Sequence, residues 1–454
     1  MAKPSTAVPR RDASTDVTGE SLPVWAKLVV AAIVAAPLQY AFTIRIGSPL
    51  KISEILIALA LVARILSPSS RPLKAPGLGF VVLLAAALAA SSLWSLVASP
   101  SALLDFTGYT RSPQGDIVFY TVFGLFALAG WWLFTQLSRD QIERAIVLSV
   151  WLCGAATLLQ IVGAAAGAEG LLTSLGYRTN TAGGEDITEA TLRSGPFLEG
   201  QHLGFFAAPG LLVALARRSW AAAIVAILVV FYSQSTTAVL GLVVAAAIIV
   251  LIRPGVKIFA SVLALSLGLL ALSAFVPAVR EFLLKQAAKV GLVDQVDQFR
   301  FAGLSFDVRE EKFLTAVKMA SDHLVLGVGP GRFGSYFSQY ADYNQLPAYY
   351  RTTATRPIAE NVYGQVFSEN GLFALVALVG LLAVLLLGSL RARPIVVGIA
   401  ASVIIGVWTQ SSWTFMPIWV YIGYLAVATR EAVETAPPAP IAPTMKVGFH
   451  RPRR

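Results

Sequence analysis

The chain has 454 residues, of which 56% are hydrophobic and only 13% are charged, and its formal net charge is +10. With a mean hydropathy of +0.70, this composition excludes a water-soluble globular protein and indicates an integral membrane protein. The basic residues are spread along the chain instead of forming one patch interleaved with aromatic residues, so nucleic acid is not an expected partner. Cys153 is the only cysteine, and no cysteine and histidine cluster has metal-binding spacing, so neither a disulfide, a metal nor a cofactor is expected.

Twelve windows are apolar and come close to the roughly 20 residues that a helix needs to cross a bilayer. They lie at residues 25–44, 50–66, 76–97, 116–136, 144–165, 202–216, 219–234, 236–252, 258–277, 371–390, 394–410 and 413–429. The expected fold is an all-α integral membrane protein of about 12 transmembrane helices, with a large extracytoplasmic loop between spans 9 and 10.

The windows divide the chain into five segments. Residues 1–23 and 431–454 are expected to be disordered cytoplasmic ends because they are rich in small polar residues, alanine and proline. Residues 24–277 hold spans 1–9 and an outer loop at 166–201, and residues 278–360 form the large loop. Residues 361–430 are expected to hold a surface helix and spans 10–12.

Basic residues recur in every second connection between the windows, for example at Arg71, Arg139, Arg217 and Arg391. Short connections rich in lysine and arginine stay in the cytoplasm. The pattern therefore predicts that both termini are cytoplasmic and that the loops 166–201 and 278–360 face outward. The outer face is expected to carry the working surface.

The large loop holds two predicted amphipathic helices, at residues 280–298 and at about 306–323, with charged and apolar positions on different faces. A glycine-rich run follows. No βαβ unit surrounds it, which argues against a nucleotide-binding loop, and its glycines are expected to form a tight turn by adopting positive φ: Gly327, Gly329 and Gly331. Tyr336 and several neighbouring tyrosines are expected either to stack on sugar rings or to lie at the lipid interface.

Three stretches resemble the O-antigen polymerase and ligase superfamily of bacterial membrane glycosyltransferases. The first is Arg193-Ser194-Gly195-Pro196-Phe197 with Gln201, which leads into a span. The second is Arg309, followed by a helix and the run Leu324-Val325-Leu326-Gly327-Val328-Gly329-Pro330-Gly331-Arg332-Phe333. The third runs from Glu360-Asn361 to Glu369-Asn370-Gly371. With the topology, the resemblance covers roughly residues 116–430. Two positions depart from the family pattern, since Glu360 stands where ligases carry a histidine and Gln201 replaces an asparagine.

The resemblance implies a GT-C-like glycosyltransferase that uses glycans linked to undecaprenyl pyrophosphate. Arg193 and Arg309 are expected to bind the pyrophosphate, because the arginine fork makes bidentate contacts with phosphate oxygens. Glu360 is expected to act as the general base, with its pKa raised by burial. No metal is expected to be needed, because the arginines balance the charge of the pyrophosphate. The expected substrate-binding residues are Asn361, Gln201, Arg332, Tyr336 and Arg356. A structural ion pair is the alternative interpretation of Arg309 and Glu360.

The favoured function is polymerisation of lipid-linked repeat units at the periplasmic face of a bacterial inner membrane. The departure at Glu360 favours a polymerase over a ligase, which transfers the finished glycan to lipid A core or another acceptor. A polysaccharide or lipid transporter is the alternative of another class, although Glu54 is the only acidic residue inside a predicted span. The expected partners are the lipid-linked donor, a glycan acceptor and membrane lipids, with a flippase and a chain-length regulator as further candidates.

Overall fold

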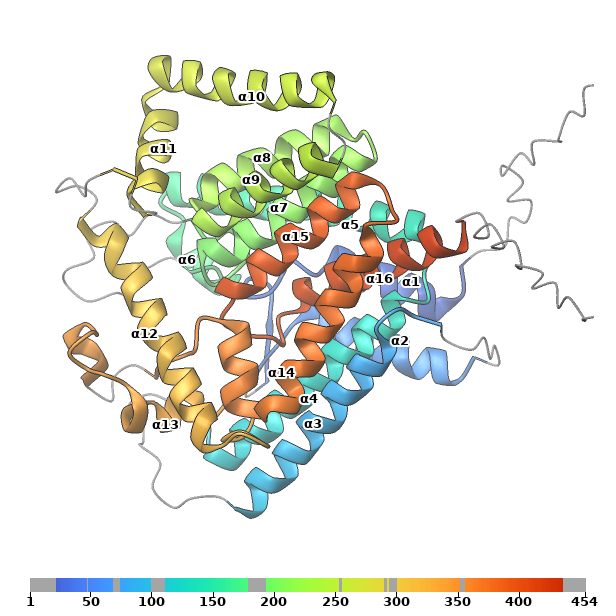
Figure 1. Cartoon of the computed structure of the whole chain (residues 1–454), viewed down its shortest axis with the longest axis vertical. Helices are drawn as coiled ribbons and strands as arrows, with labels where there is room; N and C mark the ends of the chain where they lie inside the picture. Colours follow the sequence, from blue (N-terminus) through green and yellow to red (C-terminus); the bar gives the residue numbers. More distant parts are fainter. Residues whose placement is uncertain are drawn as a thin grey trace, which may run out of the picture.

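The computed structural model describes residues 22–46, 48–67, 74–98, 111–178, 193–252, 255–289, 292–293, 300–351 and 356–435. Nearly all of this chain is helical (Figure 1). The predicted disordered ends lie almost wholly outside the described residues. The helices are α1 (Val24–Val34), α2 (Ile52–Ile65), α3 (Leu78–Val97), α4 (Pro113–Phe134), α5 (Arg139–Ala165), α6 (Glu169–Ser174), α7 (Gly200–Ala216), α8 (Trp220–Ser233), α9 (Thr236–Ile252), α10 (Val256–Phe275), α11 (Pro277–Lys289), α12 (Arg300–Asp322), α13 (Phe333–Tyr340), the 3-10 helix η2 (Ala348–Arg351), α14 (Val362–Ser389), α15 (Pro394–Thr409) and α16 (Met416–Glu434).

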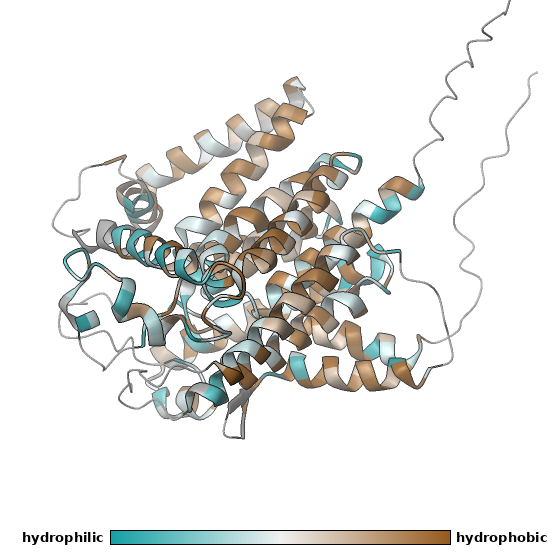
Figure 2. Cartoon of the chain, turned by 60° about the horizontal axis from the view of Figure 1, so that its bottom comes forward, coloured by the Kyte–Doolittle hydropathy of each residue, from teal (hydrophilic) through white to brown (hydrophobic). Residues whose placement is uncertain are grey.

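Each of the twelve predicted windows overlaps a helix of the structure. Within the described residues, four helical stretches are long and apolar enough to cross a membrane: Leu78–Val97, Gln114–Phe134, Arg139–Ala165 and Val362–Ser389. A fifth results if Ser266–Phe275 and Pro277–Lys289, bent by 120°, count as one span. Several further apolar helices are shorter, and Figure 2 shows that most of the helices are largely hydrophobic. The chain is therefore a multi-pass membrane protein, while the count of twelve spans stays a prediction.

The first predicted span is shorter than expected. Helix α1 ends at Val34, and residues 44–50 contain an antiparallel hairpin of β1 (Ile44–Ile46) and β2 (Ser48–Leu50), with Ile44 opposite Leu50. Pro37 gives a physical reason for the early end, because proline disfavours the helical conformation of the residue before it and cannot donate a backbone hydrogen bond. The hairpin is the exception to the all-α prediction.

Helix α14 is broken at Gly371, which has φ +79° and ψ −177°. The part before the break, expected as a surface helix, is instead mostly buried. Carbonyl groups freed by the break accept hydrogen bonds from the glycine-rich run: Val328 N donates to Ser368 O and Gly329 N donates to Glu369 O, both at 2.9 Å. The Glu369 carboxylate of this part accepts a hydrogen bond from Phe333 N at 3.2 Å, so it faces the glycine-rich run.

Gly371→Ala is expected to lower the free energy of unfolding by about 2 kcal/mol. A β-carbon at this position would overlap the carbonyl oxygen of Val325, and the positive φ is unfavourable for alanine. Thermal unfolding of the purified protein in detergent measures the effect. Gly79→Ala in α3 is the matched control, because a β-carbon there meets no atom within 4 Å. Equal stability of the two variants would contradict the assigned break.

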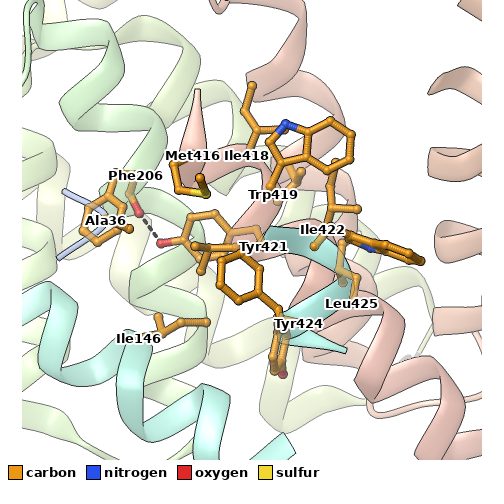
Figure 3. Close-up of a cluster of buried hydrophobic side chains, with 14 of the residues drawn as sticks. Ala36, Ile146, Phe206, Met416, Ile418, Trp419, Tyr421, Ile422, Tyr424 and Leu425 are labelled. Carbon is orange, nitrogen blue, oxygen red and sulfur yellow. Dashed lines mark hydrogen bonds between the residues drawn. The ribbon is translucent and has the colours of Figure 1, made fainter. Parts of the chain in front are cut away.

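The interior of the bundle is formed by α7, whose residues are nearly all buried, and by α16. Figure 3 shows aromatic side chains of α16 in this core, with the Tyr421 hydroxyl donating a hydrogen bond to the Phe206 carbonyl of α7. Helix α15 packs against both α7 and α9, and α14 packs against α3. These contacts fix the first turn of α7 beside the end of α15, where the candidate site lies.

Candidate active site

Four charged and polar side chains from three distant parts of the chain meet at one point. The Glu360 carboxylate accepts a hydrogen bond from Arg309 Nε at 3.0 Å through one oxygen and from Lys312 Nζ through the other. Arg309 also donates from its terminal nitrogen to the Gln201 side-chain carbonyl. The structure therefore brings together Gln201, Arg309 and Glu360, three of the predicted site residues.

Local sequence explains how these groups are held. Arg309 and Lys312 are three residues apart on α12, so they lie on the same face of the helix. Glu360 has φ +50° and precedes Asn361, whose side chain caps α14 by accepting a hydrogen bond from Gly364 N at 2.9 Å. The left-handed conformation of Glu360 is unusual for a non-glycine residue and is fixed between the loop and the cap.

The electrostatic balance at Glu360 differs from the expected one. Burial raises the pKa of the Glu360 carboxyl, but the charges and hydrogen bonds of Lys312 and Arg309 outweigh burial and leave the pKa below its ordinary value. The prediction that the pKa of Glu360 lies above its ordinary value is therefore wrong, although burial acts in the predicted direction. Lys312 is the larger of the two charges that oppose burial. Its side chain is only 1% exposed, and its Nζ lies 4.8 Å from the centre of the Tyr350 ring.

The remaining contacts tie this cluster to the first turn of α7 and to the end of α15. Gln201 donates through its amide nitrogen to the carbonyl of Thr409, and the His202 ring nitrogen Nε2 lies 2.9 Å from the Ser411 hydroxyl. Arg193 packs beside the same turn, since a β-carbon on Gly200 would lie 3.0 Å from Arg193 Cγ. Arg193 therefore lies beside Gly200, the residue before Gln201, at the edge of the cluster.

The other predicted arginines form a second group. Arg356 donates to the carbonyl of Gly331 and pairs with Asp116 of α4 at 2.9 Å, and Asp116 also pairs with Arg111 at 3.1 Å. The Arg332 guanidinium is 1% exposed and lies 5.3 Å from the centre of the Tyr336 ring. Burial holds the pKa of Arg332 below its usual value. The contacts of Arg332 and Arg356 described here are with Tyr336, α4 and the glycine-rich turn.

The glycine-rich turn holds the second group against the bundle. Gly327, Gly329 and Gly331 all have positive φ, with values of +68°, +106° and +73°. A β-carbon would overlap the Ser95 hydroxyl at Gly329 and the Tyr120 ring at Gly331. Only glycine allows this backbone to approach α3 and α4 so closely.

A third charged group lies at the opposite end of α7. Arg217, which follows α7, pairs with Asp140 at 2.8 Å and with Glu143 at 3.3 Å. Arg139 pairs with Glu143 at 2.6 Å, and Arg430 donates to Thr135 O at 2.8 Å. A helix of this length is about 25 Å long. Basic residues predicted to be cytoplasmic are thus gathered at the other end of α7 from Gln201, which contacts Arg309.

Three residues of these clusters were missed in the sequence. Lys312 was placed on α12 without a role, although its spacing from Arg309 could have indicated a shared partner. Arg111 and Asp116 flank the start of a predicted span and carry no local motif. No group of three or more potential metal ligands occurs in the described part of the chain.

The fold and this site define a multi-pass membrane protein with a basic and acidic cluster at one end of its bundle. Residues 221–379 match a family model described as O-antigen ligase, which supports the predicted resemblance to the O-antigen polymerase and ligase superfamily. The matched region contains Arg309 and Glu360 but begins after Arg193 and Gln201, so it is narrower than the predicted resemblance. A comparison with curated proteins found no match. The family implies an enzyme of glycosyltransferase type that acts on a polyprenyl-linked glycan donor and an acceptor.

Proposed function

We propose that the protein polymerises oligosaccharide repeat units linked to undecaprenyl pyrophosphate, and that Arg309, Lys312 and Glu360 form the reaction centre. The observation that carries the proposal is the pair of cations on one carboxylate at the end of the bundle. Arginine and lysine supply fixed positive charge for a departing pyrophosphate, and the carboxylate supplies a proton acceptor. A metal ion is not required for either task.

In the proposed reaction, a hydroxyl oxygen of the acceptor sugar attacks the anomeric carbon of the donor glycan. The bond between that carbon and the pyrophosphate oxygen breaks, and the polyprenyl pyrophosphate leaves with the bonding electron pair. Glu360 takes the hydroxyl proton, while Arg309, Lys312 and Arg193 stabilise the charge on the pyrophosphate. A single displacement inverts the configuration at the anomeric carbon.

The lowered pKa of Glu360 makes it a weak base before substrate binds. A bound pyrophosphate competes for Arg309 and Lys312 and places negative charge near the carboxylate, and both effects raise the pKa of Glu360. The substrate itself then converts Glu360 into a better proton acceptor. This coupling offers a reason for pairing the base with the pyrophosphate-binding cations.

The pH dependence of chain joining tests this coupling. Activity requires ionised Glu360, so it is lost as pH falls through the pKa of this group. The acid limb of kcat/KM reports the free enzyme and is expected below the ordinary range of a glutamate. The acid limb of kcat reports the enzyme with substrate bound and is expected at higher pH. Coincident limbs, measured with a synthetic lipid-linked repeat, would contradict the coupling.

Asn361, Gln201, Tyr336, Arg332 and Arg356 are proposed to contact the substrate. Gln201 is in direct contact with the reaction centre, because it accepts a hydrogen bond from Arg309. The site is proposed to face the periplasm of a bacterial inner membrane, with twelve spans and both termini in the cytoplasm. Support for this orientation comes from the basic residues gathered around Arg217 at the other end of α7. A flippase and a chain-length regulator are proposed partners.

The glycan profile of a deletion strain separates polymerase, ligase and transporter. The strain is complemented with wild type, with Glu360→Ala or with Glu310→Ala, the matched control of an exposed carboxylate on α12. A polymerase predicts that the deletion and Glu360→Ala leave single repeats that still reach their final acceptor. Wild type and Glu310→Ala restore long chains.

Two other outcomes would overturn this proposal. Long chains stranded on the polyprenyl carrier would identify a ligase, and full-length chains from Glu360→Ala would remove Glu360 from the reaction. Membrane levels of each variant, measured by immunoblot, show that a negative result does not come from failed insertion.

A further inference from the structure

The side-chain amide of Gln160, near the C-terminal end of α5, makes the full set of hydrogen bonds that such a group can form. Its Nε2 donates to Arg178 O at 3.2 Å and to Ser194 Oγ at 3.1 Å. Its Oε1 accepts from Gly195 N at 2.7 Å and from the Tyr232 hydroxyl at 3.3 Å. Because an amide has two donor hydrogens and two acceptor positions, its capacity is filled. Gln160 therefore ties α5 to Ser194 and Gly195.

Residues 193–197, called here the Arg193 segment, are held from two other sides as well. The carbonyl of Pro196 accepts hydrogen bonds from Tyr40 N at 3.0 Å and from Ala41 N at 3.1 Å. The Phe197 side chain is completely buried, and it packs near aromatic rings of α7 and of the residue before α16. The segment is therefore fixed on several sides, and Gln160 supplies its hydrogen bonds to α5.

The Arg193 segment approaches α5 closely. Gly195 has φ +55°, and a β-carbon there would lie 2.6 Å from Oγ1 of Thr157, which shares a helix face with Gln160. Helix α5 is long and apolar enough to cross a membrane, and a polar side chain inside such a helix is costly and commonly marks a functional position. An apolar side chain of similar volume would fill the same space, so the amide contributes through the groups that it holds.

The Arg193 segment leads directly to the reaction centre. Arg193 is bonded to Ser194, so the hydrogen bonds of Gln160 also limit where the Arg193 backbone can lie. On its other side, Arg193 lies against the first turn of α7, because a β-carbon on Gly200 would lie 3.0 Å from both Arg193 O and Arg193 Cγ. The next residue, Gln201, accepts a hydrogen bond from Arg309. Arg193 is thus held between α5 and the residue that contacts the reaction centre.

We propose that Gln160 is a positioning residue, which holds Arg193 where its guanidinium meets the pyrophosphate bound at Arg309 and Lys312. Gln160 does not touch the substrate and acts through Arg193. The inference rests on the proposed function, because it requires Arg193 to bind the pyrophosphate. The competing interpretation is a purely structural glutamine, which would affect unfolding without affecting the affinity for pyrophosphate.

Calorimetric titration of the full-length protein in detergent with inorganic pyrophosphate tests this role. Gln160→Met keeps a similar volume and removes the hydrogen bonds to the Arg193 segment. Gln160→Met and Arg193→Gln are each expected to weaken binding by about 10-fold, because a small displacement of a binding group removes much of its effect. The double variant is expected to bind as Arg193→Gln does, because both changes remove the same contact.

Ser149→Ala is the matched control. Ser149 is a buried residue of the same helix, and its hydroxyl has no hydrogen-bond partner in the part of the chain that the structure describes. It is expected to bind pyrophosphate as wild type does. If Gln160→Met does not fold, Ser194→Ala takes its place, because it removes one bond between Gln160 and the segment. Its smaller loss of affinity is expected to vanish in the Arg193→Gln background.

Wild-type affinity in Gln160→Met, or losses that multiply in the double variant, would overturn the positioning role. Hydrogen exchange of residues 193–197 measures the release of the segment without any ligand. Exchange is expected to be faster in Gln160→Met than in wild type, and unchanged exchange would also overturn the role.

Failure of the proposed function gives a different pattern, which titration of Arg309→Gln reveals. Affinity that depends on Arg309 but not on Gln160 would overturn the positioning role and leave the reaction centre in place. Affinity that does not depend on Arg309, or no binding by wild type, would overturn the reaction centre and the positioning role together.

Discussion

Arg309→Gln is expected to lower the rate of glycan joining by about 100- to 1,000-fold, as removal of one preorganised charge-stabilising donor does in other enzymes. Arg309 is the residue that joins Gln201 to Glu360, and its charge is available for a departing pyrophosphate. Glutamine keeps the polar character but removes the charge and the fork. The measurement is the turnover of a synthetic lipid-linked repeat by the purified protein.

Lys318→Gln is the matched control for this variant. Lys318 belongs to the same helix, its side chain is 52% exposed, and its ion pair with Glu311 is long, at 4.0 Å. It is therefore expected to keep wild-type activity. If Arg309→Gln joined repeats within about threefold of wild type, a role for Arg309 in a structural ion pair would replace its proposed role in the reaction.

Lys312→Met is expected to lower the free energy of unfolding by about 3 kcal/mol, because it removes the more deeply buried of the two cations that pair with Glu360 and leaves Arg309 as the remaining counter-charge. Lys312 is 1% exposed and Glu360 is 20% exposed, so the remaining carboxylate loses a close counter-charge in a largely dry environment. Methionine keeps the length and apolar stem of lysine. Denaturation of the detergent-solubilised protein measures the loss.

The double variant Lys312→Met/Glu360→Gln supplies the internal control. Removing both charges is expected to recover part of the stability lost in Lys312→Met, although activity stays abolished because the proton acceptor is gone. If the double variant loses as much stability as Lys312→Met and Glu360→Gln lose in sum, Lys312 and Glu360 do not interact as assigned. Activity in the double variant would contradict the role of Glu360.

Helix positions were largely predictable from the sequence because apolar windows and their basic flanks are local signals. The positions of α3, α4 and α5 follow them closely. The exceptions have tertiary causes. The break at Gly371 is accompanied by hydrogen bonds from the distant glycine-rich run, and the residues before it, expected as a surface helix, are mostly buried. The hairpin of β1 and β2 lies at the connection between the first two predicted windows, where no strand was predicted.

The site was predictable only in part. The order of motifs indicated Arg309 and Glu360, but their pairing across 51 positions and the addition of Lys312 needed the structure. The lowered pKa of Glu360 comes from Lys312 and Arg309 together, and Lys312, the larger of the two opposing charges, had no assigned role in the sequence. Arg332 and Arg356 were predicted as contacts of a single site, whereas Asp116 draws Arg356 toward α4 and away from Glu360.

The most direct test of the proposed reaction uses the purified protein in liposomes with a labelled, polyprenyl pyrophosphate-linked repeat as its only glycan. Wild type is expected to produce longer lipid-linked chains and to release one polyprenyl pyrophosphate for each new linkage, while Glu360→Gln produces neither. Repeats that stay unjoined until lipid A core is added, or that cross the bilayer without joining, would contradict the proposed polymerase.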